Sequence, residues 1–273
     1  GVRAVVLIGG GEPLLHPATK SLMRMLADSE VKLGLVTNGT LLHKYLDEVE
    51  ECLQWVRISV DAATQTTYDS FRPTRRRQSA FRSVIQNIER ITGKSKCSVG
   101  YSFVALTRMN SDGTCLTNIP EIFDAVSIAR KIGCNYFELK AALDLDHFIQ
   151  GLPLHLIEEI KMQIDKATIL VSPDFALLLS SSLKDLISET PQEQSKEYHR
   201  CLVTRLRTTI TPTGVFLCAY HRGQRFARLG DPVKEPFTEI WKRVLSHSVD
   251  PAIDCRFHCA RHEMNLFLES HKE

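Results

Sequence analysis

The sequence predicts an α/β protein built on a parallel sheet, and three observations support this. Short apolar runs, typical of buried strands, alternate with amphipathic segments, typical of helices, over about the first 140 residues. Prolines suited to a first helical position stand at residues 17 and 120. Five strand–helix steps follow one another directly, which indicates right-handed crossovers in an open sheet or a curled barrel.

The first strand is expected over residues 2–8, a run that is apolar apart from Arg3. A helix follows over residues 17–28, and the second strand, 31–36, ends in the turn Thr37-Asn38-Gly39. The other elements follow by the same patterns: helices over 41–52, 79–91 and 120–132, and strands over 55–60, 98–106 and 134–139.

In the remainder of the chain the regular alternation of strands and helices ends. Residues 150–200 are expected to be mostly helical, with a short strand at 168–171 and a polar linker at 188–198. Residues 207–211 and 215–217 flank Pro212-Thr213-Gly214, which predicts a hairpin, with helices to follow at 235–245 and 259–268. We therefore expect two domains, residues 1–187 and a small α+β module that carries cysteines, residues 188–273.

Composition excludes several classes of protein. The 273 residues are 43% hydrophobic and 24% charged, which excludes a disordered chain. No apolar run approaches the roughly 20 residues that span a bilayer, so we expect no membrane association. Net charge is +2 with only six tyrosines and two tryptophans, and we expect no nucleic-acid partner.

The first strand is followed by Gly9-Gly10-Gly11-Glu12-Pro13. Glycines let the backbone approach a ligand, and a carboxylate there can take a cationic group. The run is neither a phosphate-binding P-loop nor a dinucleotide fingerprint. A tight strand-to-helix turn is the plain alternative. At the carboxyl end of a parallel strand, where such sheets bind ligands, a ligand site is favoured.

Gly10-Gly11-Glu12-Pro13 resembles the second signature of the radical S-adenosylmethionine (radical SAM) enzymes, and further resemblances follow in order. Thr37-Asn38-Gly39 looks like the exit of the family's next strand, and Ile58-Ser59-Val60-Asp61 like the end of the one after it. Tyr136-Phe137-Glu138-Leu139-Lys140 looks like the last strand that faces the cofactor. The resemblance implies that cofactor-binding residues are Gly10, Gly11, Glu12, Pro13, Asn38, Ser59, Asp61, Arg72 and Lys140. In it Glu12 and the glycines hold the methionine amino end, Ser59 the ribose or carboxylate side, and Arg72 the carboxylate.

One departure from the family pattern is large. The defining C-x3-C-x2-C, which holds the catalytic iron–sulfur cluster, is absent, so the catalytic residues are unknown. The resemblance implies a six-unit partial (β/α)6 barrel, of which this chain lacks the first unit. We expect an N-terminal truncation, an active enzyme in the full-length protein, and a chain that is inactive alone.

Four cysteines lie in the last quarter of the chain: Cys201, Cys218, Cys255 and Cys259. The hairpin separates the first two, and the last two are one helical turn apart, so all four can converge on a metal. Spacing alone leaves zinc, an iron–sulfur cluster and four independent buried thiols open. The segment from Thr211 to Cys218 and Glu239-Ile240-Trp241 resembles the SPASM/twitch module, which implies one auxiliary [4Fe–4S] cluster on these cysteines.

The resemblance as a whole implies a radical SAM oxidoreductase or modifying enzyme. It would cleave S-adenosylmethionine to a 5′-deoxyadenosyl radical that abstracts a substrate hydrogen, as in peptide maturation or sugar and aminocyclitol modification. Expected partners are a small-molecule or peptide substrate and an electron donor such as flavodoxin or ferredoxin, in the cytoplasm. The alternatives are a non-catalytic α/β binding protein with a structural zinc module, and a degenerate radical SAM relative. Neither the substrate nor the oligomeric state can be inferred from the sequence.

Overall fold

The computed structural model describes residues 1–74, 78–93, 96–188 and 196–271. The chain divides into two compact units, the first made of Gly1–Ala142 and Gly151–Glu189 and the second of Leu143–Gln150 and Thr190–Glu273. The assignment of residues 143–150 to the second unit was not anticipated from the sequence. Most of the expected linker, residues 189–195, lies outside the described residues.

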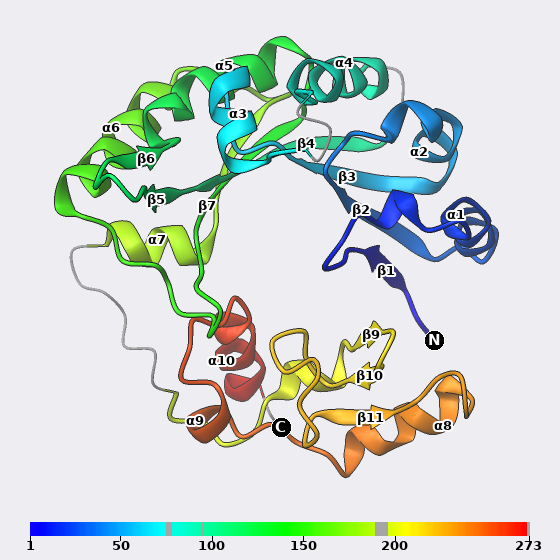
Figure 1. Cartoon of the computed structure of the whole chain (residues 1–273). Coiled ribbons are helices and arrows are strands. Elements are labelled where there is room, and N and C mark those ends of the chain that lie inside the picture. The colour runs from blue at the N-terminus through cyan, green and yellow to red at the C-terminus, as the bar shows by residue number, and fades with distance from the viewer. Residues whose placement is uncertain (75–77, 94–95, 189–195, 272–273) are drawn as a thin grey trace. The chain divides into compact units, whose positions relative to one another are not determined.

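The first unit is an α/β fold with a parallel sheet, as expected. Its six strands are all parallel to their neighbours, in the order β1 (Ala4–Leu7), β2 (Lys32–Thr37), β3 (Leu53–Ser59), β4 (Ser98–Ala105), β7 (Tyr136–Ala141) and β8 (Ala176–Leu179). The sheet is curved, and helices line its outer side (Figure 1). These α-helices are α1 (Thr19–Asp28), α2 (Leu46–Cys52), α4 (Phe81–Ile91), α5 (Ile122–Lys131) and α6 (Leu154–Thr168).

Shorter elements complete the unit. They are α3 (Gln65–Phe71), α7 (Ser181–Ile187), the 3-10 turns η1 (Pro13–Leu15), η2 (Leu42–Lys44) and η3 (Ile119–Glu121), and the antiparallel pair β5 (Thr107–Met109) and β6 (Cys115–Thr117). Neither α3 nor the β5–β6 pair was predicted.

The strand expected at residues 168–171 is wrong. Thr168 ends α6, and Ile169 is 80% exposed in the turn beyond it. The strand in this part of the chain is β8, which pairs with β7 and becomes the sixth strand of the sheet. The apolar residues 169–171 follow the C-terminal end of α6 and lie outside it, and an apolar run of that length cannot by itself distinguish a strand from such a segment.

Alternation along the central strands gives the sheet two different faces. The helix-covered face carries fully buried side chains, among them Val56, Ile58, Tyr101, Phe103, Phe137 and Leu139. The opposite face, here called the polar face, carries Arg57 and Ser59 of β3 and Glu138 and Lys140 of β7, all partly exposed. A period of two separates these sets, so one face forms the core and the other can meet a ligand.

The second unit has its own small core. Its antiparallel sheet has the order β11 (Arg228–Gly230), β10 (Gly214–Phe216), β9 (Thr209–Thr211), and the predicted hairpin is the β9–β10 connection. Its helices are η4 (Leu202–Arg205), α8 (Phe237–Lys242), η5 (Arg243–Leu245), α9 (Pro251–Asp254) and α10 (His262–Ser270). Val215, Leu229, Ile240 and Phe257 pack together between them. Within the described residues, no helix of either unit is long and apolar enough to cross a membrane.

Candidate active site at the carboxyl edge of the parallel sheet

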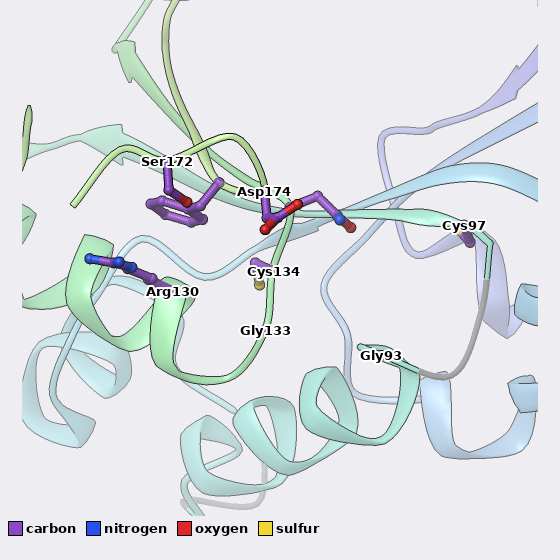
Figure 2. A pocket seen from close by; sticks show the side chains of 9 residues that line it. Gly93, Cys97, Arg130, Gly133, Cys134, Ser172 and Asp174 are labelled. Carbon is purple, nitrogen blue, oxygen red and sulfur yellow. The ribbon is translucent and has the colours of Figure 1, made fainter.

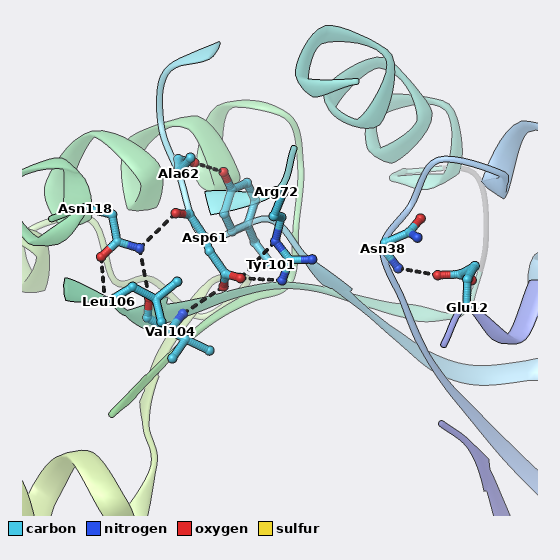
Figure 3. Close-up of polar contacts among 9 residues, drawn as sticks. All are labelled: Glu12, Asn38, Asp61, Ala62, Arg72, Tyr101, Val104, Leu106 and Asn118. Atoms are coloured by element: carbon cyan, nitrogen blue, oxygen red, sulfur yellow. Dashed lines mark hydrogen bonds and ion pairs between the residues drawn. The ribbon is translucent and has the colours of Figure 1, made fainter. Parts of the chain in front are cut away.

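Glu12 joins the exits of the first two strands. Its Oε1 accepts hydrogen bonds from Leu14 N (3.1 Å) and Thr37 Oγ1 (2.6 Å), and its Oε2 accepts one from Asn38 N (2.7 Å). The Asn38 contact is drawn in Figure 3. An ionised carboxylate has about four acceptor positions, and three are already used. Glu12 therefore builds the site, and one acceptor position remains for a ligand.

The glycines before Glu12 present open backbone. Gly10 and Gly11 are exposed, and a Cβ on either would have no atom within 4 Å. Pro13 follows and opens η1, which Glu12 caps through the Leu14 N–H. The loop thus offers a ligand bare peptide groups beside a fixed carboxylate.

The exit of β2 is a tight, well-bonded turn. Gly39 has φ +79°, and a Cβ there would lie 2.7 Å from Ile58 Cγ2, so glycine is required on both counts. Asn38 Oδ1 accepts from Thr40 N at 2.9 Å, and the buried Asn87 donates from Nδ2 to Gly39 O at 2.9 Å. These bonds fix Asn38 beside Glu12.

Asp61 and Arg72 form an ion pair at the exit of β3 (Figure 3). Asp61 is 3% exposed with φ +60°, and its Oδ1 accepts from Val104 N at 2.8 Å. Arg72, at the end of α3, donates from Nε and Nη2 to Asp61 Oδ2, the Nε contact being 2.9 Å. A guanidinium has five N–H donors, so Arg72 keeps donors for a second anion.

Three residues that the sequence analysis did not single out hold the Asp61 loop. Tyr101 donates its hydroxyl hydrogen to Ala62 O, and Asn118 Nδ2 donates to Asp61 O (2.9 Å) and Val104 O (2.9 Å) (Figure 3). Glu121 accepts from Ala63 N at 2.7 Å and from the hydroxyls of Thr64 and Thr67.

The environment of this carboxylate stabilises its charge. Burial alone raises the pKa of Glu121, but its hydrogen bonds outweigh burial and lower that pKa below the ordinary value. The only signal of these partners in the sequence is the polar pair around Ile119-Pro120, and pairing across the fold cannot be inferred from it.

Ser59 and Lys140 lie on the polar face near the carboxyl ends of β3 and β7, and Lys140 is in register with Val104. Lys140 Nζ is 3.1 Å from Glu138 Oε2, and Arg57 Nη1 donates to the same oxygen at 2.7 Å. Burial, and then the charge of Arg57, lower the pKa of Lys140, while Glu138 opposes the shift. Arg57 and Glu138 were not predicted as site residues.

The four C-terminal cysteines all lie in the second unit. Cys255 belongs to its apolar cluster, and Cys201 and Cys259 pack against that cluster. His221 Nε2 is 3.2 Å from Cys255 Sγ, and Asn265 Nδ2 donates to Cys201 Sγ at 3.5 Å. Burial raises the pKa of the Cys255 and Cys201 thiols above the ordinary value.

These thiols are not arranged as a finished metal site. In the part of the chain that the structure describes, no group of three or more Cys, His, Asp or Glu side chains could hold a metal ion. We therefore derive no step through a metal at Cys201, Cys218, Cys255 and Cys259, or through a catalytic cluster in the first unit.

A cavity of about 380 Å³ lies at the opposite, amino end of the strands (Figure 2). Its lining includes Cys97 and Cys134, whose thiol pKa values burial raises to about 12. Such thiols are protonated and unreactive at neutral pH. The residues predicted to bind a cofactor do not line this cavity.

Comparisons with known proteins point to one family. The family model described as the radical SAM superfamily matches residues 1–110. AdoMet-dependent heme synthase of Methanosarcina barkeri is 33% identical over 72 residues, 26% of this chain and 21% of that protein. GTP 3′,8-cyclase of Chlorobaculum tepidum is 30% identical over 115 residues, 41% of this chain and 33% of that protein. The matched segments thus span a third or less of these relatives.

A solved structure extends the likeness in fold. The crystal structure of Streptococcus suis SuiB superimposes with a TM-score of 0.60 at 12% identity and covers 87% of this chain and 55% of that one. At this identity the match concerns the fold alone. The similarity to the radical SAM superfamily thus lies in the N-terminal part of the chain, residues 1–110 of 273.

Proposed function

We propose that this chain is the cofactor- and substrate-binding part of a radical SAM enzyme. The observation that carries the proposal is a convergence at one edge of the sheet. Three successive parallel strands bring Glu12, Asn38 and the Asp61–Arg72 pair there, and all of them fall within the residues that the family model matches. Open α/β sheets bind ligands at this edge.

The chain's own residues have distinct tasks in this proposal. The open peptide groups of Gly10 and Gly11 and the last acceptor position of Glu12 bind the amino group of the methionine moiety. Arg72, held by Asp61, binds its carboxylate with the remaining N–H donors. Pro13 and Asn38 keep the two loops in place, Ser59 faces the ribose or carboxylate side, and Lys140 supplies positive charge below. When bound and given one electron, S-adenosylmethionine supplies a 5′-deoxyadenosyl radical that abstracts hydrogen from a substrate.

The sequence has no C-x3-C-x2-C, so the proposal assigns no residue of this chain to the catalytic [4Fe–4S] cluster. One feature supports a further strand beside β1. Among the described residues β1 pairs with β2 alone, and Val6 and Ile8 beside this edge are 46% and 60% exposed. An unpaired apolar edge is a ready partner for another strand.

We propose further that Cys201, Cys218, Cys255 and Cys259 hold one auxiliary [4Fe–4S] cluster in a SPASM/twitch-like module. The proposal is supported by the presence of all four cysteines in one small unit, where Cys255 belongs to the apolar cluster and Cys201 and Cys259 pack against it. The substrate would be a peptide, a sugar or an aminocyclitol, and the electron donor a flavodoxin or ferredoxin. Iron–sulfur chemistry of this kind favours the cytoplasm.

Binding of S-adenosylmethionine tests the first proposal. Arg72→Gln removes the cation proposed for the carboxylate, and we expect its Kd to rise about tenfold or more, the size of one charge-assisted hydrogen bond. Arg24→Gln is the matched control. Arg24 lies on α1, outside the proposed site, and it also pairs with a carboxylate, that of Glu48. Arg72→Lys, which keeps the charge, should retain part of the affinity. Equal affinity in all four proteins, by equilibrium dialysis, would contradict the proposal.

Metal content tests the auxiliary cluster. After anaerobic reconstitution, Cys218→Ser should lose the iron and acid-labile sulfide of that cluster and still bind S-adenosylmethionine. Cys115→Ser is the control, since Cys115 is exposed and lies in the first unit. Iron and sulfide unchanged in Cys218→Ser would overturn the assignment, and zinc without sulfide would favour the structural zinc module instead.

A further inference from the structure

The polar face of the sheet holds a group of three charges that extends from Arg57 of β3 to Lys140, which is in register with Val104 beside the edge described above. Arg57 Nη1 and Lys140 Nζ both contact Glu138 Oε2, at 2.7 and 3.1 Å. Their side chains are 23%, 24% and 19% exposed, so they are shielded from bulk water and yet accessible to a ligand. All three lie on strands of the first unit, so the packed sheet fixes their geometry.

The sequence of β4 makes this group possible. β4 lies between β3 and β7, so Arg57 and Glu138 are on strands roughly 10 Å apart. The β4 residues on the same face are Gly100, in register with Arg57, and Ser102, in register with Glu138. These small residues leave the space across which Arg57 reaches Glu138. The ring of Tyr136 lies over Gly100, where a Cβ would be 2.0 Å from its Cζ, and closes one side.

The group has one positive charge too many. Two cations share a single carboxylate oxygen, and Arg57 Nε is buried with no hydrogen-bond partner among the described residues. The next carboxylate, Asp61, is already paired with Arg72. A partly buried charge without a counterion is costly, and a guanidinium with free N–H donors is suited to two oxygens of one anion.

We propose that Arg57 and Lys140 bind an oxyanion, a carboxylate or a phosphate, that belongs to the substrate. This inference rests on the proposed function, because it presumes that the cofactor occupies the carboxyl edge. S-adenosylmethionine also has a carboxylate, but its proposed partner, Arg72, pairs with Asp61 at that edge. Arg57 lies two residues before Ser59, the last residue of β3, and so roughly 7 Å deeper along the strand, whereas Asp61 lies beyond the end of that strand. An anion at Arg57 therefore belongs to a molecule beyond the cofactor.

Inorganic phosphate is the probe for the test. The purified chain, labelled with 15N-arginine, is titrated with phosphate, and the Arg57 Nε–H resonance reports binding. Arg57→Gln and Lys140→Gln should each weaken the phosphate affinity about tenfold, and Arg57→Lys less. Glu138→Gln removes the competing carboxylate and should strengthen it several-fold. Arg24→Gln removes one positive charge on α1 and should leave it unchanged.

Arg57→Gln is expected to weaken phosphate binding and Glu138→Gln to strengthen it. Damage to the fold would weaken phosphate binding in both variants, so the opposite changes distinguish a binding site from such damage. A phosphate affinity that Arg57→Gln leaves intact, or that Glu138→Gln lowers, would overturn the site. A parallel titration with S-adenosylmethionine identifies the source of the anion. Unchanged cofactor affinity in Arg57→Gln supports a substrate anion, and an equal loss would overturn that assignment in favour of the cofactor carboxylate. A wild-type chain that binds phosphate at Arg57 and no S-adenosylmethionine would contradict the proposed function and leave the anion site standing.

Discussion

At the scale of single residues, the carboxyl edge is stabilised by side chains that accept hydrogen bonds from backbone N–H groups. Glu12 ties the loop after β1 to the loop after β2, and Asp61 ties the loop after β3 to β4. Each also faces the region where we place the cofactor. Substitution of either therefore acts on stability and on binding, and the two effects need separate measurements.

The first prediction concerns Glu12→Gln. An amide places an NH2 group among the three donors that Glu12 now accepts from, so at least one partly buried hydrogen bond is lost and two donors face each other. We expect a loss of about 1–3 kcal/mol in the free energy of unfolding, measured by urea denaturation. Glu50→Gln, at an exposed position of α2, should stay within roughly 0.5 kcal/mol of wild type. Equal free energies of unfolding for the two variants would show that the hydrogen bonds of Glu12 between the loops after β1 and β2 do not stabilise the fold.

The second prediction compares two glycines of similar backbone. Gly39 and Gly113 have φ of +79° and +81°, but a new Cβ meets Ile58 Cγ2 at 2.7 Å only at Gly39 and open space at Gly113. Gly113→Ala should lose about 1 kcal/mol from the left-handed conformation alone. Gly39→Ala should lose clearly more, by about 1–3 kcal/mol, through overpacking. Identical unfolding midpoints would rule out a steric requirement at the β2 exit.

At the scale of elements, the loop between β3 and α3 depends on a segment more than fifty residues away. Glu121 of η3 binds Ala63 N and Thr64 N, at the start of α3, and Asn118 binds Asp61 O. The free N–H groups at a helix start need such acceptors. This long-range cap positions Asp61, and through it Arg72.

The third prediction follows from the lowered pKa of Glu121. A carboxyl group whose folded pKa lies below its unfolded value stabilises the fold above the unfolded pKa, and this contribution is lost as pH falls through the folded pKa. Glu121→Gln should therefore be less stable than wild type at pH 7, by about 1–3 kcal/mol. The difference should shrink below about pH 4.5, the ordinary value for glutamate. A difference that stays constant in urea unfolding from pH 7 to pH 3 would exclude an ionised cap.

Sequence patterns predicted the regular elements well where the pattern is local. Apolar runs located β1 to β4 and β7, although Val2, Val6 and Ile8 of the first run are exposed rather than buried. Pro212-Thr213-Gly214 located the β9–β10 turn. They failed at β8, because the apolar run Ile169-Leu170-Val171 just after α6 looks like a strand. Local patterns could not predict the hydrogen bonds of Asn118 and Glu121 or the ion pair between Arg57 and Glu138. These contacts depend on which strands become neighbours in the fold. The motif residues came from a family resemblance, and their tasks remain proposals.

At the scale of the whole molecule, the chain combines a parallel α/β unit with a small cysteine-bearing unit, and each has its own core. The first unit separates its possible ligand regions along the strands. The carboxyl edge holds Glu12, Asn38 and Arg72, the polar face holds Arg57 and Lys140, and the amino end holds the cavity beside Cys97 and Cys134. The central claim is that the cofactor binds at the first of these.

The measurement that tests this claim most directly is a map of the NMR shifts of backbone amides and arginine Nε–H groups on addition of S-adenosylmethionine to the uniformly 15N-labelled chain. The account predicts that shifts concentrate at Gly10, Gly11, Asn38 and Gly39 and at the Arg72 side chain. Shifts gathered instead at Cys97, Asn135 and Phe175 around the amino-end cavity, or no shifts at millimolar cofactor, would contradict it.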